Sequence, residues 1–140
     1  MTDNPRNYWM KQLVEVALEA RENAYAPYSG FKVGAALMCK DGAVYKGCNV
    51  ENAAYSPSNC AERTAFFSAV AGGRTEFEAI AIVGGRESAD EYCPPCGVCR
   101  QVMAEFCHNN FLIILGKADG TYKTYSLSAL LPDRFGPSHL

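Results

Sequence analysis

The sequence predicts an α/β fold, a three-layer α/β/α sandwich with a central mixed β-sheet. Two short and continuously apolar segments, 79–83 and 111–115, are typical of strands that are buried on both faces. A helical pattern lies between them, and a strand, helix, strand unit of this kind forms a right-handed crossover with parallel strands. At 140 residues the chain has the usual size of one domain, so we expect residues 1–140 to form a single domain.

The first third of the chain predicts a helix followed by a β-hairpin. Apolar residues recur at helical spacing from Tyr8 to about Ala24, and Pro27 ends the pattern. The segments 31–38 and 43–50 then have the composition of strands and are joined by a turn containing Asp and Gly. The helix supplies a covering layer for the sheet that the hairpin begins.

A loop then leads into a second helix, expected over 60–71. Ser58 or Asn59 is the expected N-cap, because a polar side chain there accepts a hydrogen bond from the first turn. The pair Gly72–Gly73 is suited to a left-handed C-terminal cap.

The remaining elements complete the sheet. Pro94 and Pro95 open a third helix over 96–106, since proline is favoured at helix starts. Residues 116–127 add a further hairpin strand, and a proline-containing tail follows from residue 130.

The charge and the apolar runs exclude two classes of partner. A formal net charge of -2 and a pI near 5.7 argue against a surface that neutralises many phosphates, so we expect no nucleic-acid partner. The apolar runs are too short to span a bilayer and no basic, apolar leader is present, so we expect no membrane association and a cytoplasmic location. In such a reducing compartment, cysteines serve as metal ligands, catalytic groups or core residues more often than in disulfides.

Three cysteines have the spacing of a metal site. Cys96 and Cys99 are three residues apart in one helical turn, so both sulfurs reach a single point, and Cys60 begins the other helix. If the two helices lie side by side with the same polarity, their positive N-terminal ends stabilise thiolates there. Three thiolates leave one position of a tetrahedral zinc open, as in catalytic sites. Glu62 then supplies a proton shuttle, and Arg63 offsets the negative charge.

The motifs CAERTA and PCGVCRQ, which contain these residues, resemble those of the zinc-dependent cytidine deaminases, small homotetrameric nucleoside enzymes. The resemblance extends to PYSGFKVGAAL, CNVENAAY and the tail LLPDRFGP, and so covers most of the chain. It implies a hydrolase of pyrimidine salvage that converts cytidine and 2′-deoxycytidine to uridine and 2′-deoxyuridine with release of ammonia.

The resemblance also implies the mechanism. One zinc ion (Zn2+) per chain is expected on Cys60, Cys96 and Cys99, with Glu62 as general acid and base. Zinc lowers the pKa of its water, Glu62 moves the proton to N3 of the pyrimidine, and the hydroxide adds at C4. Glu62 then protonates the departing amine.

The substrate-binding residues that the resemblance implies come from several segments. The partner is a small-molecule nucleoside, and the protein is expected to be a homotetramer whose active sites are completed by neighbouring subunits. In this set Asn49 and Glu51 hold the ribose, the Ala61 amide meets the base carbonyl, Phe31 packs on the pyrimidine, Phe135 stacks on a base held by a neighbouring subunit, and Tyr55 is a further substrate-binding residue.

Cys93 departs from the family's set of ligands. It forms a C-P-P-C motif with Cys96, and we expect a strand end or loop there to direct its sulfur away from the metal. Three other interpretations of the cysteines stay open: a closed structural site with four cysteines, a thioredoxin-like dithiol and an iron–sulfur cluster. The alternative functions are a deaminase of another aminopyrimidine nucleoside, such as blasticidin S, and a non-enzymatic module stabilised by zinc.

Overall fold

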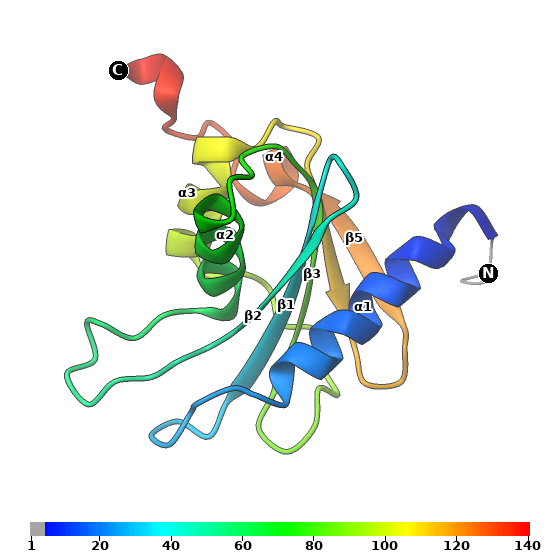
Figure 1. Cartoon of the computed structure of the whole chain (residues 1–140), viewed down its shortest axis with the longest axis vertical. Helices are drawn as coiled ribbons and strands as arrows, with labels where there is room; N and C mark the ends of the chain where they lie inside the picture. Colours follow the sequence, from blue (N-terminus) through cyan, green and yellow to red (C-terminus); the bar gives the residue numbers. More distant parts are fainter. Residues whose placement is uncertain (1–4) are drawn as a thin grey trace.

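The computed structural model describes residues 5–140, which form a five-stranded sheet with helices on both faces (Figure 1). The strand order is β2-β1-β3-β4-β5, with β3 and β4 parallel and the other neighbouring pairs antiparallel. This confirms the predicted mixed sheet and its parallel crossover. The elements are η1 (Pro5–Asn7), α1 (Tyr8–Arg21), β1 (Lys32–Cys39), β2 (Val44–Cys48), α2 (Ala61–Ala71), β3 (Phe77–Gly85), α3 (Gly97–Phe106), β4 (Leu112–Gly116), β5 (Tyr122–Ser126), α4 (Leu127–Leu130) and η2 (Pro137–His139).

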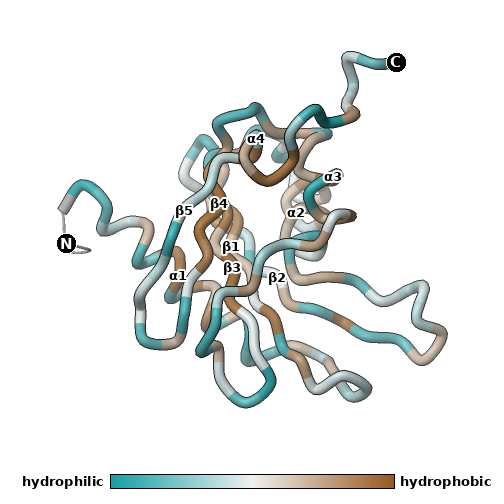
Figure 2. The backbone as a smooth tube through the Cα atoms, turned by 180° about the vertical axis from the view of Figure 1, so that it is seen from behind, coloured by the Kyte–Doolittle hydropathy of each residue, from teal (hydrophilic) through white to brown (hydrophobic). Residues whose placement is uncertain are grey.

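The sheet is the middle of three layers, because its strands bury side chains on both faces. Successive residues of a strand point to opposite faces, so Ala35 and Leu37 join the core beneath α2 and α3, whereas Ala36 joins the core beneath α1. Figure 2 shows the apolar stretches of backbone gathered along the central strands. The predicted three-layer sandwich is confirmed.

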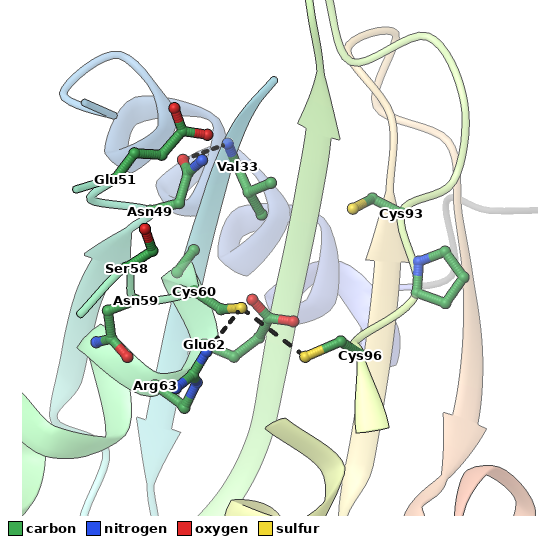
Figure 3. Close-up of a pocket in the computed structure, with 12 residues that line it drawn as sticks. Val33, Asn49, Glu51, Ser58, Asn59, Cys60, Glu62, Arg63, Cys93 and Cys96 are labelled. Carbon is green, nitrogen blue, oxygen red and sulfur yellow. Dashed lines mark hydrogen bonds between the residues drawn. The ribbon is translucent and has the colours of Figure 1, made fainter. Parts of the chain in front are cut away.

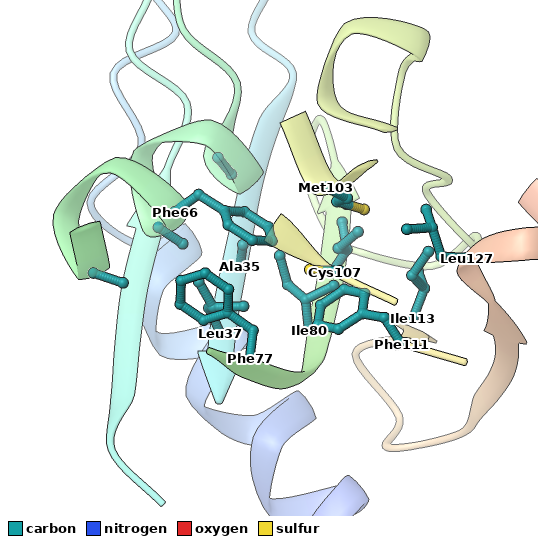
Figure 4. Packing of buried hydrophobic residues seen from close by; sticks show 14 of the residues in the cluster. Ala35, Leu37, Phe66, Phe77, Ile80, Met103, Cys107, Phe111, Ile113 and Leu127 are labelled. Carbon is teal, nitrogen blue, oxygen red and sulfur yellow. The ribbon is translucent and has the colours of Figure 1, made fainter. Parts of the chain in front are cut away.

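The larger of the two cores holds α2 and α3 against the sheet (Figure 4). The ring of Phe66 from α2 meets that of Phe77 edge to face, with centroids 5.0 Å apart, and stacks near Phe106 of α3 at 6.2 Å. Met103 of α3 is fully buried in the same core. Such aromatic contacts add to the burial of apolar area and fix the positions of both helices.

Two glycines let helices approach the sheet closely. A Cβ atom at Gly34 of β1 would overlap the carbonyl oxygen of Ala17 in α1, and one at Gly47 of β2 would overlap that of Ala61 in α2. Neither position has room for a side chain. The start of α2 therefore lies directly over the end of β2.

Several expected boundaries are corrected by the structure. The first helix ends at Arg21 rather than about Ala24, because Tyr25 leaves the helix to pair with Val50. The hairpin strand expected to reach Val50 ends at Cys48. The short helix α4 was not predicted; the hydroxyl of Ser126 caps it by accepting a hydrogen bond from the amide of Ala129.

The register places the ends of several elements at one edge of the sheet. Gly34 of β1 lies opposite Cys48 at the end of β2, and Val33 lies opposite Gly84 near the end of β3. The carboxyl end of β3 leads into α3, and that of β2 into α2, so both helices begin at this edge, where α/β proteins commonly bind ligands. Within residues 5–140, no helix has the length and apolar character needed to cross a membrane.

Candidate functional site

Three cysteine sulfurs meet where α2 and α3 begin. Cys60 and Cys96 are the N-cap residues of these helices, and both have extended backbone conformations, while Cys99 lies in the first turn of α3. The Cys60 and Cys96 sulfurs are 3.8 Å apart, those of Cys96 and Cys99 are 3.5 Å apart, and all three lie within 4.8 Å of one another. Sulfurs bound at about 2.3 Å around a tetrahedral zinc are roughly 3.8 Å apart, so this cluster has the dimensions of a zinc site.

The surroundings of the cluster favour negative charge on the Cys60 sulfur. Hydrogen bonds from Cys99 and from the guanidinium of Arg63, which lies 3.2 Å from the Cys60 sulfur, lower the pKa of Cys60 to about 5. The hydrogen bond with Cys60, together with burial, raises the pKa of Cys99. Two helix N-termini add positive potential at the cluster. A thiolate is the form in which cysteine binds zinc, so these residues fit the ion.

Glu62 places a carboxyl group beside the sulfurs. It lies in the first turn of α2, lines the pocket and is only 4% exposed. Burial raises its pKa to about 7, and the negative charge of Cys60 acts in the same direction, whereas Arg63 opposes the rise. A carboxyl group with this pKa both accepts and donates protons near neutral pH, which suits a general acid and base.

A pocket of about 270 Å³ opens beside the sulfurs and Glu62 (Figure 3). It is enclosed by the end of β2, the start of α2 and the segment that precedes α3. The lining residues are Val33, Asn49, Glu51, Ser58, Asn59, Cys60, Ala61, Glu62, Arg63, Cys93, Pro94 and Cys96. The volume and the mixture of apolar and polar groups suit a small polar molecule.

Asn49 and Glu51 are held in place by backbone groups. The side-chain oxygen of Asn49 accepts a hydrogen bond from the amide of Val33 (2.9 Å), and its NH₂ group donates to the carbonyl of Phe31 (2.7 Å). Glu51 accepts hydrogen bonds from both amides of Tyr28–Ser29 and from the Ser29 hydroxyl, which lower the pKa of its carboxyl group. These two residues follow the end of β2, and both line the pocket.

Three expected substrate-binding residues lie outside the pocket lining. Phe31 is half-buried next to the pocket, where Arg86 lies over its ring with 5.9 Å between the guanidinium carbon and the ring centroid. Tyr55 is 77% exposed on the loop before α2, with a left-handed φ of 63°. Phe135 is 57% exposed in the tail and stacks on His139. Tyr55 and Phe135 do not reach the pocket of their own chain.

The expected cap of α2 was wrong. No side chain caps this helix; the Ser58 hydroxyl accepts a hydrogen bond from the Asn52 amide, and the NH₂ group of Asn59 donates to the hydroxyl of Thr64. Ser58 and Asn59 line the pocket instead, a role signalled only by their position next to Cys60. The first-turn N–H groups are thus left without a capping side chain.

Cys93 contributes no sulfur to the candidate metal site, in agreement with the expectation that it is not a ligand. It lies outside the three-sulfur cluster, but its sulfur points into the pocket (Figure 3). Burial, with added repulsion from Glu62, raises the pKa of the Cys93 thiol to about 11, so the thiol is neutral at pH 7. The residue therefore contributes a small, uncharged surface to the pocket wall.

Comparison with known proteins identifies relatives over nearly the whole chain. Residues 7–115 match the family model of the cytidine and deoxycytidylate deaminase zinc-binding region. The chain is 47% identical over 131 residues to a cytidine deaminase of Sporosarcina psychrophila, covering 94% of both chains. It is 49% identical over 125 residues to a cytidine deaminase of Halalkalibacterium halodurans, covering 89% of this chain and 92% of the relative.

Solved structures agree with these matches. A crystal structure of cytidine deaminase from Burkholderia pseudomallei superimposes with a TM-score of 0.81 at 52% identity, covering 89% of this chain and 97% of that one. A crystal structure of cytidine deaminase from Mycobacterium tuberculosis gives a TM-score of 0.78 at 38% identity, covering 91% of this chain and 97% of that one. The fold, the sulfur cluster and the family match all lead to one conclusion: this chain belongs to the family of zinc-binding cytidine and deoxycytidylate deaminases.

Proposed function

We propose that the protein is a zinc-dependent hydrolase that deaminates cytidine and 2′-deoxycytidine to uridine and 2′-deoxyuridine, with release of ammonia. One observation carries the proposal: a buried glutamate with a raised pKa, Glu62, lies beside three converging cysteine sulfurs in a pocket of about 270 Å³. The relatives named above, which are cytidine deaminases, support the same reaction.

Glu62 moves protons in this mechanism. Zinc, when bound by Cys60, Cys96 and Cys99, lowers the pKa of a water molecule and so supplies a nucleophile at neutral pH. Glu62 accepts a proton from the water that adds to C4 of the base and delivers it to the ring nitrogen N3. It then takes the remaining proton from the hydroxyl group on C4 and gives it to the amino group, so that ammonia leaves and the C4 carbonyl of uridine forms. The pKa of about 7 suits both transfers, because the carboxyl group holds and releases a proton with similar ease.

The other pocket residues orient the nucleoside. The uncapped first turn of α2 leaves the amide of Ala61 available to the carbonyl at C2 of the base. Asn49 and Glu51, which backbone hydrogen bonds hold rigid, bind the ribose hydroxyls. Rigid partners of this kind reduce the entropy that is lost when the substrate binds.

The charges of the pocket favour a nucleoside over a nucleotide. Among the described residues that line it, Arg63 is the one with a positive charge, and its guanidinium donates to the Cys60 sulfur. The carboxylate of Glu51 would repel a phosphate at the ribose side. A nucleoside 5′-monophosphate is therefore a poorer substrate than cytidine.

The functional form is a cytoplasmic homotetramer in which neighbouring subunits complete each active site. The exposed Tyr55 and Phe135 support this arrangement, because large aromatic side chains that do not reach their own pocket are suited to contacts between subunits.

The test is turnover by the purified, zinc-loaded protein. Cytidine should lose absorbance as uridine forms, with one ammonia released per cytidine consumed. A chelator should stop the reaction, and added zinc should restore it. A folded and zinc-loaded protein that leaves both cytidine and 2′-deoxycytidine unchanged would contradict the proposal and direct attention to other aminopyrimidines, such as blasticidin S.

A further inference from the structure

Cys93 is the pocket-lining cysteine to which neither zinc binding nor proton transfer assigns a role. Its sulfur points into the pocket from the segment before α3, across from Asn49 and Cys60 (Figure 3). It stands apart from the three converging sulfurs. The role inferred below for Cys93 rests on the proposed deamination, because that reaction fixes the orientation of the base.

The reaction fixes the positions of three neighbouring ring atoms of the pyrimidine, C2, N3 and C4. C4 must lie at the cluster of sulfurs, N3 must lie within reach of Glu62, and the carbonyl at C2 faces the amide of Ala61. Glu62 and Ala61 are neighbours in the first turn of α2, so the C2–N3 side of the ring faces this helix. The atom opposite C2 in a six-membered ring is C5. The C5–H bond therefore points away from α2, toward the opposite wall.

Cys93 lies on the opposite side of the pocket from Asn49 and Cys60 (Figure 3), and the next residue, Pro94, also lines the pocket. Neither side chain carries a charge at neutral pH, since burial raises the pKa of the Cys93 thiol and keeps it protonated. An uncharged wall of this kind suits the C–H edge of the base, which neither donates nor accepts a conventional hydrogen bond. With such a wall, the size of the substituent at C5 decides which bases fit the pocket.

The Cys93 sulfur packs against the backbone of Gly84 on the side away from the pocket. A Cβ atom at Gly84 would lie 2.8 Å from this sulfur and 3.1 Å from the ring of Phe31, so the thiol and the ring both pack against the bare backbone of β3. The sulfur is thus held between Gly84 and the pocket. The space in front of it depends on the size of residue 93.

We infer that Cys93 is a specificity-determining residue that faces C5 of the base and sets the size of the C5 substituent that the enzyme accepts. Replacement of Cys93 by a smaller residue should admit 5-substituted cytidines, and a larger residue should exclude them. A single methyl group in an apolar pocket changes specificity by about tenfold or more.

The experiment compares kcat/KM for cytidine, 5-fluorocytidine and 5-methylcytidine. Cys93→Ala should raise the ratio of 5-methylcytidine to cytidine by about tenfold, and Cys93→Val should lower it by about tenfold, with smaller changes for 5-fluorocytidine. The ratio of 2′-deoxycytidine to cytidine should stay constant in both variants, because that change lies at the sugar. Cys48→Ala is the matched control: it makes the same replacement at a half-buried cysteine that does not line the pocket.

Zinc content and thermal melting establish that each variant is folded; if Cys93→Val misfolds, Cys93→Ala decides alone. Suppose that the wild-type enzyme deaminates cytidine but Cys93→Ala leaves the kcat/KM ratio of 5-methylcytidine to cytidine unchanged. That result would overturn the role of Cys93 and leave the proposed function intact. Failure of the zinc-loaded wild type to deaminate cytidine, seen before any variant is measured, would overturn both.

Discussion

At the scale of single residues, the carboxyl group of Glu62 and the sulfurs of Cys96 and Cys99 come close to the Cys60 sulfur in different ways. Glu62 follows Cys60 by two residues in α2, so the chain itself brings carboxyl and sulfur together. Cys96 and Cys99 reach Cys60 only through packing of α3 beside α2. The proposed proton shuttle, Glu62, and the cysteines that could hold zinc are therefore separable by mutation.

Replacement of Glu62 by Gln should abolish turnover and leave the zinc site intact. The amide has nearly the shape of the carboxyl group but cannot take up and release the proton, and loss of general acid–base catalysis costs about 10²–10⁴-fold in rate. Zinc content by atomic absorption and thermal melting should match the wild type. Turnover within tenfold of the wild type would exclude Glu62 as the proton shuttle.

Replacement of single cysteines should separate ligands from the pocket wall. Cys60→Ala, Cys96→Ala and Cys99→Ala should each lose stoichiometric zinc, because two sulfurs hold the ion far less tightly than three. Cys93→Ala should retain one zinc per chain, since its sulfur lies outside the cluster. Metal analysis after gel filtration measures this directly; zinc lost from Cys93→Ala would show that four cysteines hold the ion.

At the scale of helices and strands, the site depends on how closely the helices approach the sheet. Gly34 and Gly47 bring α1 and α2 within contact of the β1 and β2 backbones, which no side chain at those positions would permit. Arg21, at the end of α1, then donates hydrogen bonds to the carbonyls of Lys32 and Gly85. These bonds tie α1 to β1, which supplies Val33 to the pocket lining, and to β3.

Replacement of Gly34 by Ala should reduce the free energy of unfolding by about 1–3 kcal/mol, the usual cost of an overpacked contact. The added methyl group would overlap the carbonyl oxygen of Ala17, so α1 must shift away from the sheet. Gly97→Ala is the matched control, because no atom lies within 4 Å of its Cβ position. Urea unfolding of the two variants compares them; equal stability would mean that α1 is not in close contact at Gly34.

At the scale of the whole molecule, two segments extend outward without lining the pocket of their own chain: the tip of the loop before α2 and the C-terminal tail. Figure 1 shows the C-terminal tail projecting beyond α3, away from the start of β1. Tyr55 and Phe135 lie on these two segments and are exposed. The proposed homotetramer accounts for both, because each residue would meet the pocket of a neighbouring chain.

Replacement of Phe135 by Ala should lower kcat/KM for cytidine by about 2- to 12-fold, as expected when a stacking contact worth about 0.5–1.5 kcal/mol is lost. Zinc content should not change, because Phe135 does not line the pocket of its own chain. Leu140→Ala, also in the tail and 99% exposed, is the control. Sedimentation of the wild type should give a tetramer; a fully active monomer would contradict the proposed assembly.

The sequence by itself determined the layers of the fold and the set of cysteines that could hold zinc. Continuous apolar runs mark strands buried on both faces, and this signal is local, so β3 and β4 were predicted as parallel neighbours. The spacing of Cys96 and Cys99 on one helical turn, and of Glu62 after Cys60, is also local. Such features survive in the structure because they depend on backbone geometry that a short segment fixes alone.

Only the tertiary structure decided how the pocket is built. The N-cap of α2 is Cys60 and not Ser58 or Asn59, because pairing of Asn59 with Val50 directs the chain before the helix. Cys93 lines the pocket, because the bare backbone of Gly84 leaves room for its sulfur there. Both outcomes depend on contacts between segments distant in the chain, and local propensity carries no information about such contacts.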